Sequence, residues 1–312
     1  MTDRPLISAL LPSYNHEAFL EAAVRSALAQ TYSPFELIVV DDGSTDGSRA
    51  ILERFRDDPR VRIVLKENEG ISATFNRCAA EAKGDYLAFL GSDDRWRPDH
   101  LERAFETLQA KPEADWYYAC AELIDAEGQV IESEPSPWGE HHPEGHILMP
   151  LMKRGLSFLP FITVVMRADA FRARGPFNAG VVGIQDYDLW LRLAQHHQVA
   201  FRDEIAASNG WHGGNVSTPN DQSLARFSIE RVAVFRDLVR RLEDDPAHGG
   251  ELEYARRRLR TYVRRAGNKL LRVGRPLDAL PLLKAELRRN PLWFSGYAKL
   301  ARAVLTTKRG DA

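Results

Sequence analysis

Strand-like and helix-like segments alternate along the first 90 residues, and this alternation limits the fold more than any other feature of the sequence. Short apolar runs lie at 6–11, 35–40, 61–65 and 86–90. Between them, residues 17–30, 48–56 and 72–82 carry apolar side chains at the helical period. Such alternation is typical of an α/β fold in which helices flank a mostly parallel sheet.

Two of these apolar runs lead directly into pairs of acidic residues. Asp41 and Asp42 follow the second run in "ELIVVDDGST", and Asp93 and Asp94 follow the fourth in "YLAFLGSDDRW". The carboxyl ends of strands in an open α/β sheet form the edge where ligands bind. The alternative is that the acids only mark turns, with Asp42 or Ser44 capping a helix and "GSDD" forming a cap turn before "RPDHL".

The turn after the first strand disfavours two common nucleotide-binding classes. It reads "PSYNHE" and has no glycine, so it matches neither the G-x-G-x-x-G turn of dinucleotide-binding folds nor a P-loop. The chain also lacks the G-x-S-x-G segment of serine hydrolases. A phosphoacceptor receiver domain pairs acids at strand ends too, but after its first strand and in a far shorter chain, so it is a minor alternative.

Clustered carboxylates need a counter-charge. They repel one another unless hydrogen bonds or a cation keep them ionised. A divalent ion such as Mg²⁺ or Mn²⁺ can bind through only one or two carboxylates and complete its shell with phosphate oxygens. The sequence therefore predicts a metal site that serves a diphosphate-bearing ligand.

Four longer segments resemble the motifs of the family 2 glycosyltransferases in order and spacing. They are "LLPSYNHEAFLEAAVRSALAQTYSPFELIVVDDGSTDGS", "NEGISATFNRCAAEAKGDYLAFLGSDDRWRPDHL", "GIQDYDLWLRL" and "HGGNVS", within residues 6–217. The resemblance implies a GT-A-type, Rossmann-like fold with a mostly parallel sheet. It also implies an enzyme that uses a nucleotide sugar and inverts the configuration at the transferred carbon.

In that family, the first loop and the acids after the second strand hold the donor nucleotide. The resemblance implies that Asp42, with Asp41 beside it, accepts hydrogen bonds from the base and that Tyr14 offers a ring for stacking. The full set that it assigns to nucleotide-sugar binding is Pro12, Tyr14, Asp41, Asp42, Asn68, Gly70, Asn76, Ser92, Asp94 and His212. The alternatives are that Tyr14 is a boundary aromatic residue and that Asn76 hydrogen-bonds within the core.

The D-x-D metal motif of the family falls on Gly91, Ser92 and Asp93, so its first aspartate is missing here. The resemblance leaves Asp93 as the direct carboxylate ligand of Mg²⁺ or Mn²⁺, with Asp94 in support. His212, in "WHGGNVS", matches a family histidine and is assigned to the metal and to the departing diphosphate. We expect weak metal affinity in the absence of nucleotide.

The resemblance places the catalytic base at Asp186, in "GIQDYDLWLRL". Inversion requires a group that takes the proton from the acceptor hydroxyl, on the face opposite the leaving diphosphate. The family usually has Glu before this aspartate. Here Gln185 keeps the hydrogen-bonding capacity and removes one negative charge. Asp188 lies two positions further on, but the motif register favours Asp186.

The C-terminal part differs from the rest in charge and in periodicity. Residues 1–224 hold 21 Lys and Arg against 34 Asp and Glu, whereas residues 225–312 hold 21 against 10. Past residue 220 the pattern is wholly helical, which predicts a catalytic domain over 1–222 and a basic helical segment over 223–312. The stretch 256–275 has nine Lys or Arg and no acid. This stretch is typical of a helix on an anionic membrane surface or of a helix packed on its neighbours, and residues 274–305 resemble part of a helical-hairpin repeat.

Several features favour a cytoplasmic protein that associates peripherally with the inner face of the membrane. Cys78 and Cys120 are too few for a disulfide framework, and the N-terminus lacks signal-peptide character. The longest apolar stretch, 156–166, is too short to cross a bilayer. No nucleic-acid partner is expected.

We therefore expect a metal-dependent glycosyltransferase that moves one sugar from a nucleotide-diphosphate sugar, by default a UDP-sugar, to a glycan or lipid-linked acceptor in surface polysaccharide synthesis. Processive synthases of the family are disfavoured because the chain has no Q-x-x-R-W segment and no membrane-spanning stretch. The alternative is a non-catalytic protein of the same fold that binds a nucleotide sugar or a partner. The joint presence of Asp42, Asp93 and Asp186 argues against that alternative.

Overall fold

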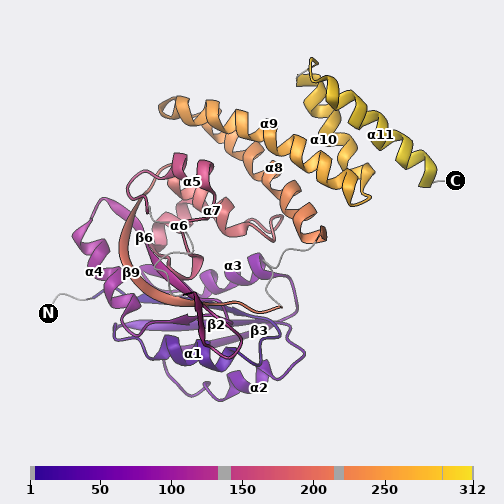
Figure 1. The fold of residues 1–312 in the computed structure, drawn as a ribbon. Helices are drawn as coiled ribbons and strands as arrows, with labels where there is room; N and C mark the ends of the chain where they lie inside the picture. Colours follow the sequence, from indigo (N-terminus) through magenta and orange to yellow (C-terminus); the bar gives the residue numbers. More distant parts are fainter. Residues whose placement is uncertain (1–3, 133–141, 214–220, 290, 311–312) are drawn as a thin grey trace. The chain divides into compact units, whose positions relative to one another are not determined.

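The computed structural model describes residues 4–132, 142–213, 221–289 and 291–310 (Figure 1). The chain divides into two compact units, Met1–Gly213 and Gly214–Ala312, and each is described by itself.

A nine-stranded sheet forms the centre of the first unit. Its strands lie in the order β3-β2-β1-β4-β8-β6-β9-β5, and β7 pairs with β6. The strands are β1 (Ile7–Ser13), β2 (Phe35–Asp42), β3 (Val61–Lys66), β4 (Tyr86–Phe89), β5 (Arg95–Trp96), β6 (Ala114–Ile124), β7 (Val130–Glu132), β8 (Val165–Arg167) and β9 (Gln198–Gly210).

The N-terminal half of the sheet follows the sequence prediction. β1 pairs in parallel with both β2 and β4, and β2 pairs in parallel with β3. Figure 1 shows α1 (Leu20–Leu28) and α2 (Ser48–Glu53) on one face of these strands and α3 (Ile71–Glu81) on the other. The change of face arises because the chain crosses from β3 back over β1 to reach β4. The loops after β1, β2 and β4 consequently open at the same edge of the sheet.

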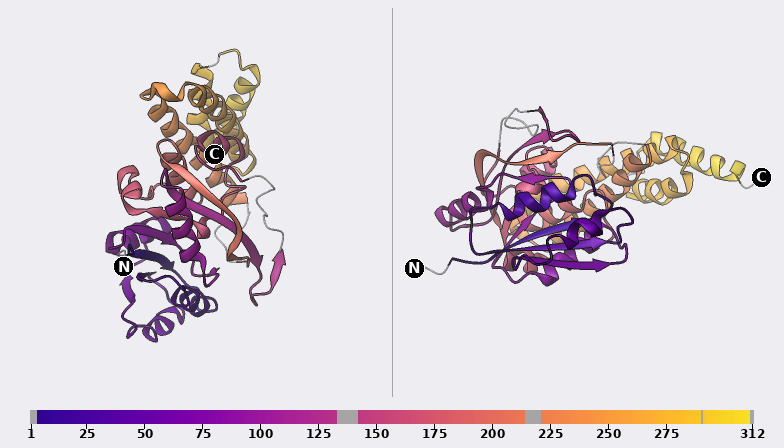
Figure 2. Two further views of the ribbon diagram at one scale, coloured as in Figure 1. Left: turned by 90° about the vertical axis from the view of Figure 1, so that its left-hand side faces the viewer. Right: turned by 90° about the horizontal axis from the view of Figure 1, so that it is seen from below.

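The second half of the sheet contains strands that the sequence predicts and strands that it does not. The apolar stretch 163–167 predicts a short strand, and β8 forms it from Val165, because Phe161–Thr163 is a 3-10 turn. β8 runs antiparallel to β4 and β6. β9 is a long curved strand that pairs in parallel with β6 (Figure 2). The sequence did not predict β9 because the charged run 202–204 interrupts its apolar residues. The pairing register between β9 and β6 also shifts along the strand. The segment "LIDAEGQVI", residues 123–131, predicts a hairpin-like turn, and β6 and β7 pair there as an antiparallel hairpin.

Two helices of this half lie close to the ranges that the sequence pattern predicts, and two were not foreseen. α4 (His100–Ala110) lies within the predicted range 98–110, and α7 (Gln185–Ala194) begins two residues before the predicted range 187–196. Asp186 therefore lies inside the first helical turn. α5 (Leu148–Arg154) and α6 (Ala168–Arg174) were not predicted, since both are only two turns long. Of the loop expected at 134–144, residues 134–141 lie outside the described part of the chain.

A cluster of aromatic rings fixes α7 against the sheet. Phe89 of β4 lies edge-on to Trp190 of α7, with ring centroids 6.1 Å apart, and Phe75 of α3 stacks on Phe177 at 5.1 Å. Phe161 contacts the same rings. Because buried aromatic pairs contribute both area and geometry, this cluster holds the start of α7 in a defined place beside the parallel half of the sheet.

The second unit is helical throughout its described residues. It consists of α8 (Asp221–Glu243), α9 (Gly249–Arg272), α10 (Pro276–Arg289) and α11 (Phe294–Gly310), and consecutive helices pack against each other. A small core that includes Leu270, Leu283 and Ala303 joins them. Among the described residues, no helix combines the length and the apolar character needed to cross a bilayer.

Candidate functional site

Three side chains from distant parts of the chain converge where the strands end. His16 follows β1, Asp93 follows β4 and His212 follows β9, and one potential metal-ligand atom from each lies within 4.8 Å of the others. Asp93 Oδ2 is 3.2 Å from His212 Nε2. The structure thus brings together Asp93 and His212, the two residues predicted for the metal. A set of two imidazole nitrogens and one carboxylate oxygen is chemically suited to a divalent ion, and it favours Mn²⁺ over the strictly oxygen-loving Mg²⁺.

His16 is the member of this cluster that sequence reasoning missed. Its Nδ1 lies 2.7 Å from Ser92 Oγ, which orients the ring and leaves Nε2 as its second nitrogen. The ring stands edge-on to His212, with centroids 5.7 Å apart, and His212 in turn stacks on Phe19 at 4.5 Å. Burial lowers the pKa of His16, which favours the neutral, metal-binding form of the imidazole. Its position in "PSYNHE", directly after the first strand, was the available signal.

The structure gives a steric reason why glycine, and not the first aspartate of the D-x-D pattern, stands at position 91. A Cβ placed on Gly91 would lie 2.2 Å from Asp94 Oδ2 and 2.9 Å from Asp93 Oδ1. The Asp94 carboxylate therefore occupies the space into which a side chain at position 91 would extend. In this arrangement Gly91 is required by the placement of the two neighbouring acids.

Asp94 holds the end of β9 against the Asp93 loop. Its Oδ1 accepts hydrogen bonds from Asn209 Nδ2 at 2.7 Å and from the Gly210 amide at 2.9 Å. Burial, reinforced by the charge of Asp93, raises the pKa of Asp94. A Cβ on Gly210 would lie only 2.2 Å from the Asp93 carbonyl oxygen, so the two backbones touch here. Asp94 and Gly210 thereby position His212, two residues further along.

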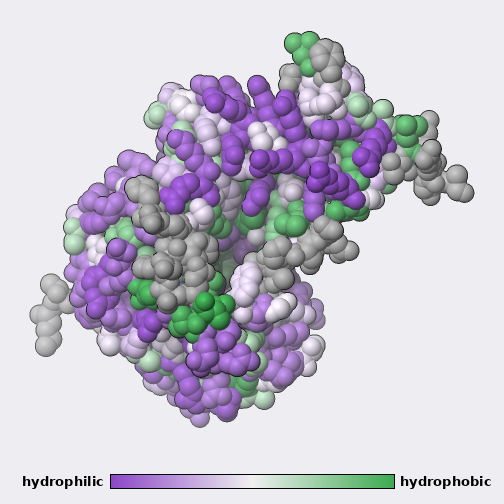
Figure 3. All heavy atoms as spheres, viewed as in Figure 1, coloured by the Kyte–Doolittle hydropathy of each residue, from purple (hydrophilic) through white to green (hydrophobic). Residues whose placement is uncertain are grey.

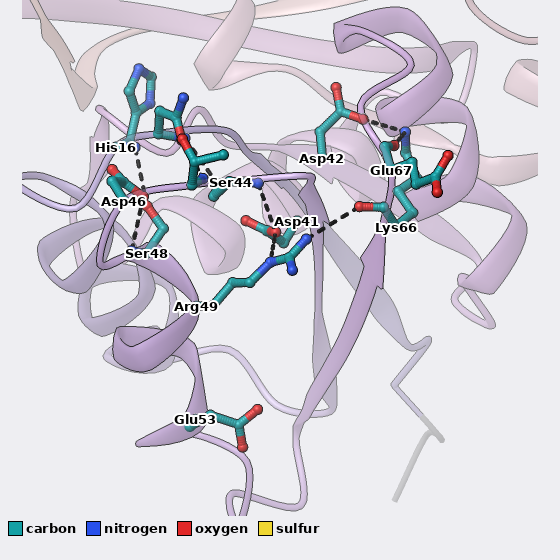
Figure 4. A network of polar contacts seen from close by, with 12 residues as sticks. His16, Asp41, Asp42, Ser44, Asp46, Ser48, Arg49, Glu53, Lys66 and Glu67 are labelled. Carbon is teal, nitrogen blue, oxygen red and sulfur yellow. Dashed lines mark hydrogen bonds and ion pairs between the residues drawn. The ribbon is translucent and has the colours of Figure 1, made fainter.

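The first acid pair, Asp41 and Asp42, organises the loops after β2 and β3 (Figure 4). Asp41 is fully buried, and its Oδ1 accepts from Arg49 Nε at 2.7 Å and from the Ser44 amide at 3.1 Å. This burial makes Asp41 a support for the loop after β2 rather than a surface that a ligand could touch. Neither acid pair caps a helix, because α2 begins after Gly47 and α4 after Asp99.

Asp42 binds the loop that leads into α3. Its two oxygens accept hydrogen bonds from the amides of Glu69 and Gly70, each at 2.9 Å, and it pairs with Lys66. Lys66, the last residue of β3, was not identified from the sequence. The ion pair and the two amide hydrogen bonds fix the Asp42 carboxylate at the carboxyl end of β2.

The other residues assigned to the nucleotide differ in accessibility. Tyr14 is 46% exposed and Asn68 is exposed, whereas Pro12 is buried within β1. Both polar atoms of the Asn76 side chain hydrogen-bond to the backbone of Phe177. Nδ2 donates to the Phe177 carbonyl at 2.9 Å, and Oδ1 accepts from the Phe177 backbone amide at 2.8 Å. The side chain of Asn76 thus acts within the fold, as the core alternative described.

Asp186 lies in the first turn of α7, and its Oδ1 accepts a hydrogen bond from the Tyr187 amide at 2.7 Å. Burial raises the pKa of Asp186 to about 6. By contrast, Asp188 is 2% exposed and forms an ion pair with Arg192 at 3.1 Å. Of these two aspartates, Asp186 therefore has the proton affinity of a general base near neutral pH, and Asp188 has a structural partner.

Sequence comparison assigns the chain to a family. The model described as "Glycosyl transferase family 2" matches residues 8–175. An uncharacterized glycosyltransferase of Rickettsia felis is 27% identical over 254 residues, which cover 78% of this chain and 41% of that protein. The putative teichuronic acid biosynthesis glycosyltransferase TuaG of Bacillus subtilis is 42% identical over 110 residues, covering 35% of this chain and 44% of TuaG. The chain thus spans less than half the length of either relative.

Solved structures share the fold. The structure of S. aureus TarS 1-349 in complex with UDP has a TM-score of 0.58 at 18% identity, covering 97% of this chain and 91% of TarS 1-349. Mannosyltransferase PcManGT from Pyrobaculum calidifontis, in complex with GDP-Man and Mn²⁺, has a TM-score of 0.59 at 19% identity, covering 97% and 87%. At such identities the likeness concerns the fold alone, and it confirms the expected GT-A-type α/β architecture. Since the family model covers more than half of the sequence, the chain belongs to glycosyl transferase family 2.

Proposed function

We propose that this chain is an inverting, non-processive glycosyltransferase. It moves one sugar from a nucleotide-diphosphate sugar to a hydroxyl of a glycan or of a lipid-linked acceptor. The observation that carries the proposal is the convergence of His16, Asp93 and His212 at the carboxyl ends of β1, β4 and β9. The UDP and GDP-Man complexes of the two structural neighbours support the same class of donor.

His16, Asp93 and His212 are the proposed ligands of a divalent ion, with Mn²⁺ preferred. When bound, the ion would neutralise charge on the donor's diphosphate. Ser92 orients His16, while Asp94 and Gly210 place the His212 loop. The Mn²⁺ in the PcManGT complex agrees with this choice.

Nucleotide binding is proposed to use the exposed Tyr14 and Asn68 beside the fixed Asp42 carboxylate. Asp42 Oδ1 already accepts from Lys66 and from the Glu69 amide, whereas Oδ2 accepts only from the Gly70 amide and keeps a lone pair for a hydrogen bond from the base. Pro12, Asp41, Gly70 and Asn76 then shape the loops around the nucleotide. A UDP-sugar remains the default donor.

Asp186 is proposed to act as the catalytic base. Its ionised carboxylate takes the proton from the acceptor hydroxyl while the acceptor oxygen forms a bond to the anomeric carbon. The bond from that carbon to the diphosphate oxygen breaks at the same time, and the nucleoside diphosphate leaves with the electron pair. Attack opposite the leaving group inverts the configuration.

The acceptor is proposed to belong to a surface polysaccharide pathway, in line with the name of the TuaG relative. The cytoplasmic location and the contact of the basic helical segment with an anionic membrane surface stay predictions. Release from membrane fractions by high salt would support that contact, because attraction between basic side chains and anionic lipids is screened by salt.

The decisive experiment compares Asp186→Asn with the wild type in sugar transfer and in donor affinity. Loss of the base should slow transfer by ~10²- to 10⁴-fold while the donor dissociation constant stays the same. Asp57→Asn, which removes an exposed carboxylate in the same unit, is the matched control. An unchanged transfer rate in Asp186→Asn would refute the base assignment. If the wild type binds donors but transfers and hydrolyses none of them, the non-catalytic alternative holds.

A further inference from the structure

Three helices of the second unit, α8, α9 and α10, line a pocket that is rich in arginines. The pocket has a volume of about 480 Å³, within the range of small-molecule sites. Arg236 and Arg240 reach it from α8, and Arg256 and Arg260 reach it from α9. The apolar side chains Val239 and Leu259 and the acidic Glu243 and Glu286 complete the lining.

The two glutamates offset only part of the positive charge of this pocket, because four arginines line it against two glutamates. Glu243 pairs with Arg256 at 2.8 Å, and Glu286, which is 3% exposed, pairs with Arg264 at 3.4 Å. Over the described segments of the chain, the guanidinium groups of three lining residues have no hydrogen-bond or ion-pair partner. These residues are Arg236, Arg240 and Arg260.

The spacing of these arginines has an energetic cost. Arg236 and Arg240 are separated by four positions on α8, and Arg256 and Arg260 by four positions on α9. Like charges at this spacing lie on one helix face and destabilise the helix. Because Glu243 offsets Arg256, the uncompensated positive charge around the cavity lies on Arg236, Arg240 and Arg260, and a bound anion would relieve the repulsion among them.

We propose that this arginine pocket binds a phosphate or diphosphate group. Planar guanidinium groups recognise phosphate oxygens through paired, charge-assisted hydrogen bonds, and several of them around one cavity match a multiply charged anion. The strongly hydrophilic face of the helical unit in Figure 3 is compatible with a polar ligand. The group could belong to a free phosphate compound or to a phospholipid headgroup. The pocket lies wholly within the second unit, so it is distinct from the His16, Asp93 and His212 cluster.

The test uses the full chain, a chelator and no donor, so that metal-assisted diphosphate binding in the first unit is suppressed. Arg240→Gln with Arg260→Gln removes one unpaired guanidinium from each helix. The control is Arg231→Gln with Arg265→Gln, which removes two exposed charges from the same helices outside the pocket. Binding is measured by calorimetry with inorganic pyrophosphate and by sedimentation with phosphatidylglycerol vesicles.

We expect the pocket variant to lose affinity by about tenfold or more, since each charge-assisted bond is strong, while the control stays close to the wild type. Selective loss of pyrophosphate binding identifies a free phosphate ligand, and selective loss of vesicle binding alone identifies a lipid headgroup. Equal losses in both variants, or no binding of either probe by the wild type, would overturn the proposal. If the double variant does not give a wild-type circular dichroism spectrum, Arg236→Gln provides the same comparison with one exposed side chain changed.

Discussion

At the scale of single residues, the burial of Asp186 raises its pKa, and this pKa should set how sugar transfer depends on pH. Its carboxyl is neutral below its pKa of about 6 and ionised above it, and only the ionised form can accept the acceptor's proton. We therefore expect kcat/KM for transfer to rise between about pH 5 and pH 7 and then to level off. A profile measured with constant metal and donor saturation checks this. A flat profile over the same range would contradict a base with a raised pKa.

Gly210 provides a second test at this scale. A methyl group at this position would meet the Asp93 carbonyl oxygen at 2.2 Å, so one of the two backbones must move. We expect Gly210→Ala to lower the free energy of unfolding by about 1–3 kcal/mol and to weaken Mn²⁺ binding. Gly213→Ala is the matched control, because a Cβ there would meet nothing within 4 Å. Equal Mn²⁺ affinity in the two variants would show that the close approach does not shape the metal cluster.

At the scale of secondary-structure elements, Asn76 fastens α3 to the segment that leads toward α7. Its amide makes two hydrogen bonds with Phe177, and Ser72 Oγ donates to the Val181 carbonyl at 2.9 Å nearby. Asn76→Ala removes both amide bonds, so we expect a loss of about 1–3 kcal/mol in the free energy of unfolding measured with urea. Arg77→Ala, on the exposed side of the same helix, should change it little. A large rise in the donor KM without loss of stability would instead indicate direct contact with the nucleotide.

The sequence predicted the elements whose apolar residues recur at a single strand or helix spacing. β1 to β4 and their helices have uniform apolar runs, and β2 is buried almost throughout. α5 contains Pro150, and β9 mixes Arg202, Asp203 and Glu204 into its strand, so neither shows a clear period. Their positions come from pairing and packing between distant segments, which local patterns do not record.

The same distinction applies to the candidate site. Motif register identified Asp93 and His212, which the structure brings together. It did not identify His16, because only the parallel pairing of β1 with β4 places the two loops beside each other. The sequence also could not distinguish the accessible Tyr14 from the fully buried Asp41, since exposure depends on which neighbours cover a side chain.

At the scale of the whole molecule, a metal bound by His16, Asp93 and His212 would connect three distant segments of the first unit. Mn²⁺ at ~100 times its dissociation constant should stabilise the folded state by about 2.7 kcal/mol, since the unfolded chain cannot present the three ligands together. We expect a rise in the thermal midpoint that His16→Ala strongly reduces. Exposed His146→Ala should keep the full shift. Equal shifts in both variants would exclude His16 as a ligand.

The sequence separation within this cluster also bears on how the protein is made. His16 lies 76 positions before its partner Ser92, and Asp93 lies 119 positions before His212. Because closing a long loop costs conformational entropy, we expect these contacts to form late in folding. During synthesis on the ribosome, His16 and Asp93 leave the exit tunnel long before His212. An incomplete nascent chain therefore cannot capture the ion with its full ligand set, and loading coincides with completion of the first unit.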